Sequence, residues 1–90
     1  MKIDTEQVIE TYKDRIFVIG LTMLKNPDDA EDVVQETFLK YHTYKKGIES
    51  KKHIESWLYK VAINKAKDIQ RKVLEKKTSI YRRLYGNYSI

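Results

Sequence analysis

The sequence contains no cysteine, only one proline and three glycines, and no long apolar run. Without cysteine the chain has no disulfide and no thiolate chemistry, which fits a reducing compartment. No stretch approaches the roughly 18 apolar residues of a membrane span, and Lys2 leads into polar residues rather than into the apolar region of a signal peptide. We therefore expect a cytoplasmic protein that makes no membrane contact.

The 90 residues suffice for one domain with a modest core. So few glycines and prolines leave few turns and favour helix. We predict an all-α fold, a compact bundle of three to four helices. Residues 1–72 are expected to form the domain, and residues 73–90 a helical extension or a linker tail. For this tail, continuation of the last helix, packing on the bundle and a linker all stay open.

The net charge of +5 is unevenly distributed. Residues 1–36 carry four Lys or Arg against nine carboxylates, whereas residues 37–90 carry fourteen against four. Two partners of different charge, the second a polyanion, would explain this split. Two solvated faces that merely differ in composition would explain it as well.

The first helix is expected from about Thr5 to Leu24, with Asp4 or Thr5 as its N-cap. Gly20 inside it indicates the close approach of another backbone, although a merely tolerated glycine is nearly as good an explanation. The segment Lys25-Asn26-Pro27 ends the helix because the residue before proline is disfavoured in α geometry. The predicted buried face is Val8, Ile9, Tyr12, Ile16, Ile19, Gly20 and Met23, widened by Phe17, Leu21 and Leu24.

The second helix, from Asn26 to about Lys45, has the clearest start in the sequence. Asn26 suits the N-cap and Pro27 the first helical position, and Asp28 and Asp29 favour the positive end of the helix dipole. Apolar residues at helical spacing predict a buried face of Ala30, Val33, Val34, Thr37, Phe38 and Tyr41. A second, mostly polar stripe with the same spacing is Asp32, Gln35, Glu36 and Leu39. We expect this second stripe to meet a partner.

The second helix is expected to end near Gly47, which suits the left-handed position after a helix C-terminus. The third helix is expected over residues 52 to 71 or 72, with Ser50 or His53 as its cap. Its predicted core stripe is Ile54, Trp57 or Leu58, Val61, Ala62 and Ile69. Its basic stripe, at spacings of four, three and four, is Lys60, Asn64, Lys67 and Arg71. Asparagine is a poor helix former whose side chain can read base edges, so Asn64 weighs slightly against an ordinary solvated face.

Catalytic and metal chemistry have little support in the sequence. His42 and His53 fit no zinc pattern, and the carboxylates between residues 28 and 32 lack the central glycine of a calcium loop. There is no glycine-rich phosphate loop. We predict that the protein is not an enzyme and uses neither a metal nor a cofactor.

Residues 41–71 interleave aromatic and basic side chains. Proteins bind single-stranded nucleic acid in this way, because cations follow the phosphates and rings stack on exposed bases. Besides the basic stripe, the candidate residues are Tyr44, Lys51, Lys52, His53 and Trp57. Packing of Trp57 in the core is the simpler alternative for that residue.

The run from Tyr12 to Lys72 resembles region 2 of bacterial RNA polymerase sigma factors, most closely the extracytoplasmic-function (ECF) group of the sigma-70 family. The matching segments are N-P-D-D-A-E-D-V-V-Q-E-T-F-L-K (26–40) and S-W-L-Y-K-V-A-I-N-K-A-K-D-I-Q-R-K (56–72). The resemblance implies a compact helical domain with two functional surfaces. It also implies an anti-sigma factor as a possible partner, although no residue here identifies one.

The first implied surface binds the RNA polymerase core. In the family, the polar stripe docks on the clamp helices, a coiled coil of the β′ subunit. The corresponding residues here are Asp32, Gln35 and Glu36, flanked by Asp28, Asp29 and Leu39.

The second implied surface recognises and melts the promoter −10 element through the non-template strand. The loop at about residues 44–53 and the basic stripe would carry this activity, with Trp57 largely packed and supporting the loop. A complete ECF factor has a further helix-turn-helix domain for the −35 element, and the eighteen residues after Lys72 are too few for it. Two alternatives stay open: a small helix-turn-helix-like domain that binds duplex DNA, and a protein-interaction module without DNA binding.

Overall fold

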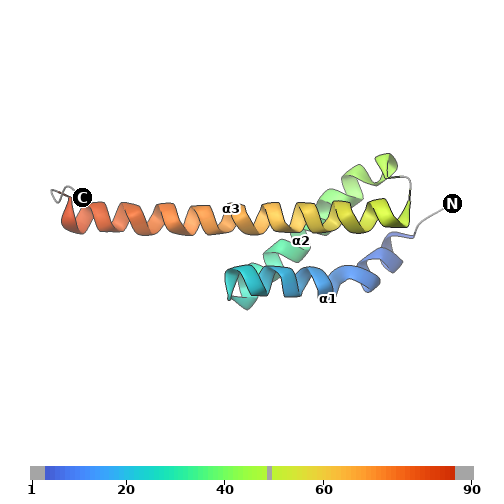
Figure 1. Cartoon of the computed structure of the whole chain (residues 1–90), viewed down its shortest axis with the longest axis horizontal. Coiled ribbons are helices and arrows are strands. Elements are labelled where there is room, and N and C mark those ends of the chain that lie inside the picture. Colours follow the sequence, from blue (N-terminus) through green and yellow to red (C-terminus); the bar gives the residue numbers. More distant parts are fainter. Residues whose placement is uncertain (1–3, 49, 87–90) are drawn as a thin grey trace.

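Three α-helices and one short 3₁₀ helix make up the fold. The computed structural model describes residues 4–48 and 50–86, where α1 is Thr5–Leu24, α2 is Pro27–Tyr44, η1 is Lys45–Gly47 and α3 is Lys51–Tyr85. These residues include no strand. The predicted all-α bundle is therefore confirmed. Figure 1 shows α1 and α2 beside the first part of α3, whose remainder projects past them.

All three α-helices begin at a side-chain cap. The side-chain oxygens of Asp4, Asn26 and Ser50 accept hydrogen bonds of 2.8 to 3.3 Å from backbone N–H groups two or three residues further on. These bonds satisfy donors that the helix itself leaves free. They also decide between the candidates, because the caps are Asp4 rather than Thr5, and Ser50 rather than His53.

The turn between α1 and α2 needs only two residues. Asn26 is extended, with φ −143° and ψ 119°, as its place before Pro27 requires. Lys25 takes the left-handed conformation at φ 56°, and its N–H donates to the Leu21 carbonyl at 2.8 Å. The turn therefore holds one non-glycine residue, Lys25, in a strained conformation, and it brings α2 directly back along α1.

Gly47 does not occupy the left-handed position predicted for it. The chain tightens into η1 after Tyr44, and the Ile48 N–H donates to the Lys45 carbonyl at 3.1 Å. No glycine in the described ranges has a positive φ. The prediction was wrong because a 3₁₀ turn continues the right-handed backbone and so needs no left-handed residue.

The core lies where the three helices meet. Its buried residues are Val8, Ile16 and Gly20 of α1; Ala30, Val33, Thr37, Phe38 and Tyr41 of α2; and Ile54, Leu58, Ala62 and Ala66 of α3. Several details differ from expectation. Leu21, predicted to widen the buried face of α1, is exposed, and Ala66 is fully buried although it was not predicted. The remaining predicted core residues are only half-buried: Ile9, Tyr12, Phe17, Ile19, Met23, Leu24, Val34, Val61 and Ile69. Between the two candidates on α3, Leu58 is fully buried, whereas Trp57 is half-buried.

Gly20 allows the backbones of α1 and α2 to approach each other closely. A Cβ at this position would lie 3.0 Å from the Ala30 Cα atom and 3.3 Å from the Cβ atoms of Ala30 and Val33. Such distances are shorter than ordinary van der Waals contact. Of the two explanations for Gly20, the structure supports close approach.

α3 is much longer than the sequence indicated. It passes residue 72 without a break and ends at Tyr85, while the side chains from Arg71 to Leu84 are all exposed. Gln70 Nε2 donates to the Met23 carbonyl at 2.8 Å, which ties α3 to the C-terminal end of α1. The described part of the tail is thus a helical continuation, and residues 87–90 lie outside the described ranges. The domain boundary at residue 72 stays a prediction.

Replacing Gly20 with Ala is expected to destabilise the fold. Alanine improves helix propensity by about 1 kcal/mol. The added methyl group must, however, push apart two packed backbones, and overpacking typically costs about 1–3 kcal/mol. Urea denaturation followed by circular dichroism should show a lower free energy of unfolding. Gly47→Ala is the matched control, since a Cβ there meets nothing within 4 Å; equal stability of the two variants would contradict the close approach.

Candidate functional site

The polar stripe of α2 faces away from the core. We call it the acidic stripe, and it consists of Asp28, Asp29, Asp32, Gln35, Glu36 and Leu39. Asp29 and Glu36 are half-buried and the other four are exposed. Leu39 is 64% exposed, so it contributes little to the core and leaves an apolar contact point amid the carboxylates. The structure thus brings all six predicted residues onto one face.

The first two residues of this stripe also serve the helix start. The backbone N–H groups of Asp28 and Asp29 donate to Asn26 Oδ1 at 2.8 and 3.3 Å. Their carboxylates lie near the positive end of the helix dipole. Helix capping therefore accounts for these two residues even without a partner, whereas it does not account for Asp32, Gln35 and Glu36.

A groove of about 510 Å³ lies between the end of α2, η1 and the beginning of α3. We call it the aromatic groove; its lining residues are Lys40, Tyr44, Gly47, Ile48, His53, Trp57 and Val61. Three residues that the sequence indicated as nucleic-acid contacts, Tyr44, His53 and Trp57, are thus brought together. Tyr44 is 61% exposed and can meet a ligand directly.

Trp57 combines packing with exposure. Its ring meets the buried Tyr41 ring edge to face, with centroids 6.1 Å apart and an angle of 62° between the planes. Burial raises the pKa of Tyr41 above its ordinary value. Since Trp57 is held by Tyr41 on one side and lines the groove on the other, it forms a rigid wall.

The basic stripe continues from the aromatic groove along α3. Lys60, Asn64, Lys67 and Arg71 are all exposed, and Lys60 lies one helical turn after Trp57. Asp68 lies beside the far end of the stripe, where its carboxylate binds both Arg71 Nη2 and Lys72 Nζ. These hydrogen bonds, that of Lys72 first, lower the pKa of Asp68 below its ordinary value.

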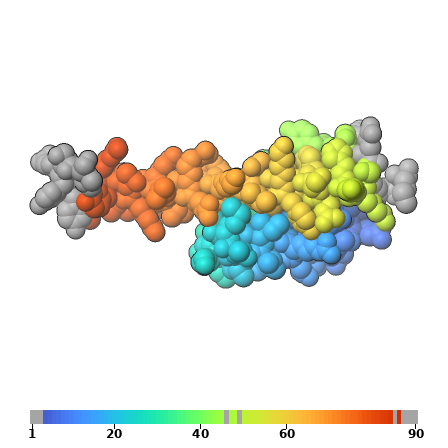
Figure 2. All heavy atoms as spheres, in the orientation of Figure 1, coloured from blue at the N-terminus to red at the C-terminus, as the bar shows by residue number. Residues whose placement is uncertain are grey.

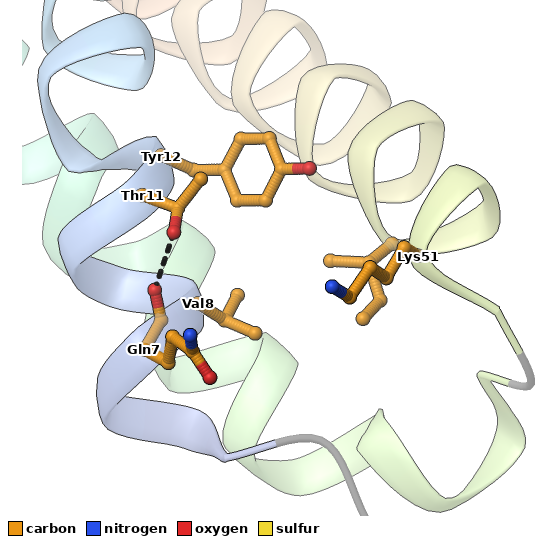
Figure 3. A pocket seen from close by; sticks show the side chains of 6 residues that line it. Gln7, Val8, Thr11, Tyr12 and Lys51 are labelled. Carbon is orange, nitrogen blue, oxygen red and sulfur yellow. Dashed lines mark hydrogen bonds between the residues drawn. The ribbon is translucent and has the colours of Figure 1, made fainter. Parts of the chain in front are cut away.

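Lys51 is separated from the other nucleic-acid candidates. It lines a small cavity between α1 and the start of α3, together with Gln7, Val8, Thr11, Tyr12 and Ile54. Figure 3 shows its side chain directed toward α1. The cavity is about 100 Å³, well below the size of ordinary ligand pockets. Lys52 is exposed, but it is not among the residues that line the aromatic groove.

Lys40 links the two surfaces and was missed in the sequence. Its Nζ lies 3.9 Å from Glu36 Oε1 on the acidic stripe, while its side chain also lines the aromatic groove. The signal was present, because Glu36 and Lys40 are four residues apart in the favourable order on one helix. The two candidate surfaces therefore adjoin along the last turns of α2.

An aromatic and charged cluster holds α3 against α1. Arg15 Nη1 donates to the Tyr59 hydroxyl at 3.3 Å and lies 3.8 Å from Glu55 Oε1. The Tyr59 ring meets the Tyr12 ring edge to face at 6.3 Å. Desolvation, with the nearby Glu55 carboxylate, raises the pKa of Tyr12. The cluster fixes the orientation of the first turns of α3, which carry half of the aromatic groove.

Two features are absent from residues 4–48 and 50–86: a cluster of metal-ligating side chains and a membrane-spanning helix. No three or more His, Asp or Glu side chains are grouped so that they could hold a metal ion. None of the helices in these ranges has the length and apolar character needed to cross a membrane.

The chain is thus a helical domain with two adjoining candidate surfaces. Residues 8–75 match the sigma-70 region 2 family, so the chain belongs to that family, and the resemblance is confirmed. The chain is 32% identical over 65 residues to the ECF RNA polymerase sigma factor SigW of Bacillus subtilis. This match covers 72% of the chain and 35% of SigW.

A second relative is the RNA polymerase sigma factor SigV of Bacillus subtilis, at 33% identity over 64 residues. The match covers 71% of this chain and 39% of SigV. The matched region thus spans less than two-fifths of either relative. No solved structure matches the chain significantly.

Asp68 is expected to titrate below the ordinary aspartate value of 3.8. Because its folded-state pKa is depressed, the stabilisation from Lys72 and Arg71 is present above about pH 4 and is lost as the pH falls through the depressed value. Carboxyl-carbon NMR shifts should show this midpoint. Lys72→Ala should move it upward, and an unchanged midpoint would contradict the assigned contact.

Proposed function

We propose that this domain acts in transcription initiation, docking on the β′ clamp helices of RNA polymerase and capturing the non-template strand of the promoter −10 element. One observation carries the proposal. The acidic stripe and the aromatic groove occupy different, adjoining parts of the surface, with the Glu36–Lys40 ion pair at their border. A domain that binds polymerase and DNA at the same time needs two such surfaces.

Polymerase docking is assigned to the centre of the acidic stripe. Asp32 and Gln35 are exposed, and neither is needed to cap the helix. A carboxylate, an amide and the apolar Leu39 on one face suit a helical partner with basic and apolar side chains. Asp28 and Asp29 are flanking contacts, because much of their role is already explained by the helix start.

DNA capture is assigned to the aromatic groove and the basic stripe. Unstacking a base costs a few kcal/mol, which a pocket that binds the extruded base offsets. Tyr44 and His53 line that pocket and Trp57 forms its rigid wall. Lys60, Lys67 and Arg71 would hold the phosphates, and Asn64 would meet a base edge.

The remaining basic candidates divide by position. Lys40 and Lys52 are exposed, and we propose that they help to hold the strand near the groove. Lys51 faces the cavity beside α1, so we assign it no DNA contact. Asp68 limits the attraction at the far end of the stripe because it already binds Arg71 and Lys72.

The polymerase assignment predicts that Gln35→Ala/Glu36→Ala weakens binding to a fragment containing the β′ clamp helices by about tenfold or more, since residues central to an interface dominate its affinity. Isothermal titration calorimetry measures the change. Glu31→Ala is the matched control, because Glu31 is exposed on α2 but lies outside the stripe. Equal binding by the wild type and the double variant would refute the assignment.

The DNA assignment predicts that Lys60→Ala/Asn64→Ala weakens binding to single-stranded non-template −10 DNA by about five- to tenfold, with the clamp helices present to orient the domain. Losing one phosphate contact should also reduce the slope of log affinity against log salt by about 0.7. Fluorescence anisotropy at several salt concentrations measures both quantities.

Two comparisons complete this experiment. Lys13→Ala removes a half-buried charge of α1 that pairs with Glu10 away from the stripe, and it should leave the affinity nearly unchanged. Tighter binding to duplex than to single strand, without clamp-helix binding, would favour a duplex-binding regulator. Unchanged DNA affinity in the double variant, with clamp-helix binding intact, would favour a protein-interaction module.

A further inference from the structure

The projecting half of α3 carries an apolar stripe that nothing in the described chain covers. We call it the α3 seam, made of Val73, Leu74, Ile80 and Leu84 with Lys77 in its middle. The four apolar side chains are 44%, 65%, 49% and 67% exposed. Figure 2 shows this orange and red part of α3 standing clear of the body. Twelve helical residues make a seam of about 18 Å, or three turns.

The seam continues the buried side of α3. Ala62, Ala66 and Ile69 pack in or against the core, and Val73 follows at the same alternating spacing of four and three residues. Lys77, Ile80 and Leu84 then follow at four, three and four. The face of α3 that α1 and α2 cover in the body is therefore the same face that is exposed to solvent from Val73 to Leu84.

A second groove lies at the base of the seam. It is about 480 Å³ and is lined by residues from the α1–α2 turn, including Met23, Leu24 and Asp29, and by Val73, Leu74 and Lys77 of α3. A helix laid along the seam would reach this groove with one end. It would take the position beside α3 that α1 and α2 occupy in the body.

The charges around the seam indicate the partner. Residues 71–85 hold six Lys or Arg against the single Glu75. Lys77 lies within the seam itself, where a docked helix would partly desolvate its amine. A charged residue at such a position favours a partner that supplies the opposite charge.

We propose that the α3 seam docks an acidic amphipathic helix of a partner protein, with a carboxylate of that helix facing Lys77. Its apolar side chains would cover Val73, Ile80 and Leu84, and its flanking carboxylates would meet the bases on either side. The seam shares no residue with the acidic stripe or the aromatic groove, although Asp29 of the acidic stripe lines the groove at its base.

Other occupants fit less well. A second copy would place two strongly basic helices together and would desolvate Lys77 on at least one of them without a carboxylate. A lipid surface would meet an apolar face interrupted by a charge. Nucleic acid would meet apolar side chains where cations are needed, because among the residues after Arg71 the basic stripe is continued only by Arg82 at helical spacing.

The test uses the full chain labelled with ¹⁵N and a designed peptide of about 21 residues, three heptads with a Leu/Ile seam, Glu flanks and a Glu placed opposite Lys77. The same peptide with Lys in place of Glu is the control probe. We expect the acidic peptide to change the amide chemical shifts of about residues 70–85. Its affinity should be at least about tenfold higher than that of the Lys peptide.

Variants locate the binding. Ile80→Asp/Leu84→Asp should lower the affinity for the acidic peptide by at least about tenfold. Lys77→Glu should make the chain bind the Lys peptide more tightly than the Glu peptide. Arg82→Glu makes the same charge change off the seam and should alter affinity by less than about threefold. All four positions are exposed, so circular dichroism should show an intact fold.

Four results would overturn the proposal. The first is equal affinity for the two peptides, and the second is an equal change of peptide affinity in Lys77→Glu and Arg82→Glu. The third is self-association in sedimentation that Ile80→Asp abolishes. The fourth is binding to anionic phosphatidylserine vesicles that Ile80→Asp abolishes. Of these, the last two would assign the seam to a second copy and to a membrane, respectively.

Discussion

The close contact between α1 and α2 at Gly20 determines where both candidate surfaces lie. The two-residue turn at Lys25 and Asn26 returns the chain at once, and only a glycine opposite Ala30 lets the two backbones come this close. With one face of α2 committed to that contact and to α3, the opposite face must point to solvent. The exposure of the acidic stripe is therefore a consequence of packing, whether or not a partner binds it.

The same packing determines the aromatic groove. Tyr41 is buried because α2 ends against the beginning of α3, and its ring gives Trp57 a fixed support. From the other side, Arg15 and Tyr59 tie the same turns of α3 to α1. Because the core holds the walls of this groove, the proposed binding of an extruded base would not first have to order its side chains.

Local rules predicted much of this fold. Capping chemistry, the Pro27 restriction and helical periodicity depend on neighbours in sequence, so the helix starts and the buried faces were predictable. Gly47 and Ala66 were not, because a 3₁₀ ending and the burial of a small residue depend on what packs nearby. For the same reason, the sequence grouped Lys51 with the nucleic-acid candidates, whereas only tertiary structure shows that it faces α1.

The length of α3 could not be decided from periodicity, since an apolar face predicts a helix whether or not anything covers it. An isolated helix is marginal in water, and helices in proteins are stabilised mainly by burial of an apolar face. The body buries this face only as far as about Gln70, where the side chain binds the Met23 carbonyl. Beyond that point the apolar residues recur at the same spacing, although most of the intervening residues are charged. A sequence that maintains this pattern past its own core encodes a surface for another helix, and Lys77 within it makes a basic copy of the same chain an unfavourable choice.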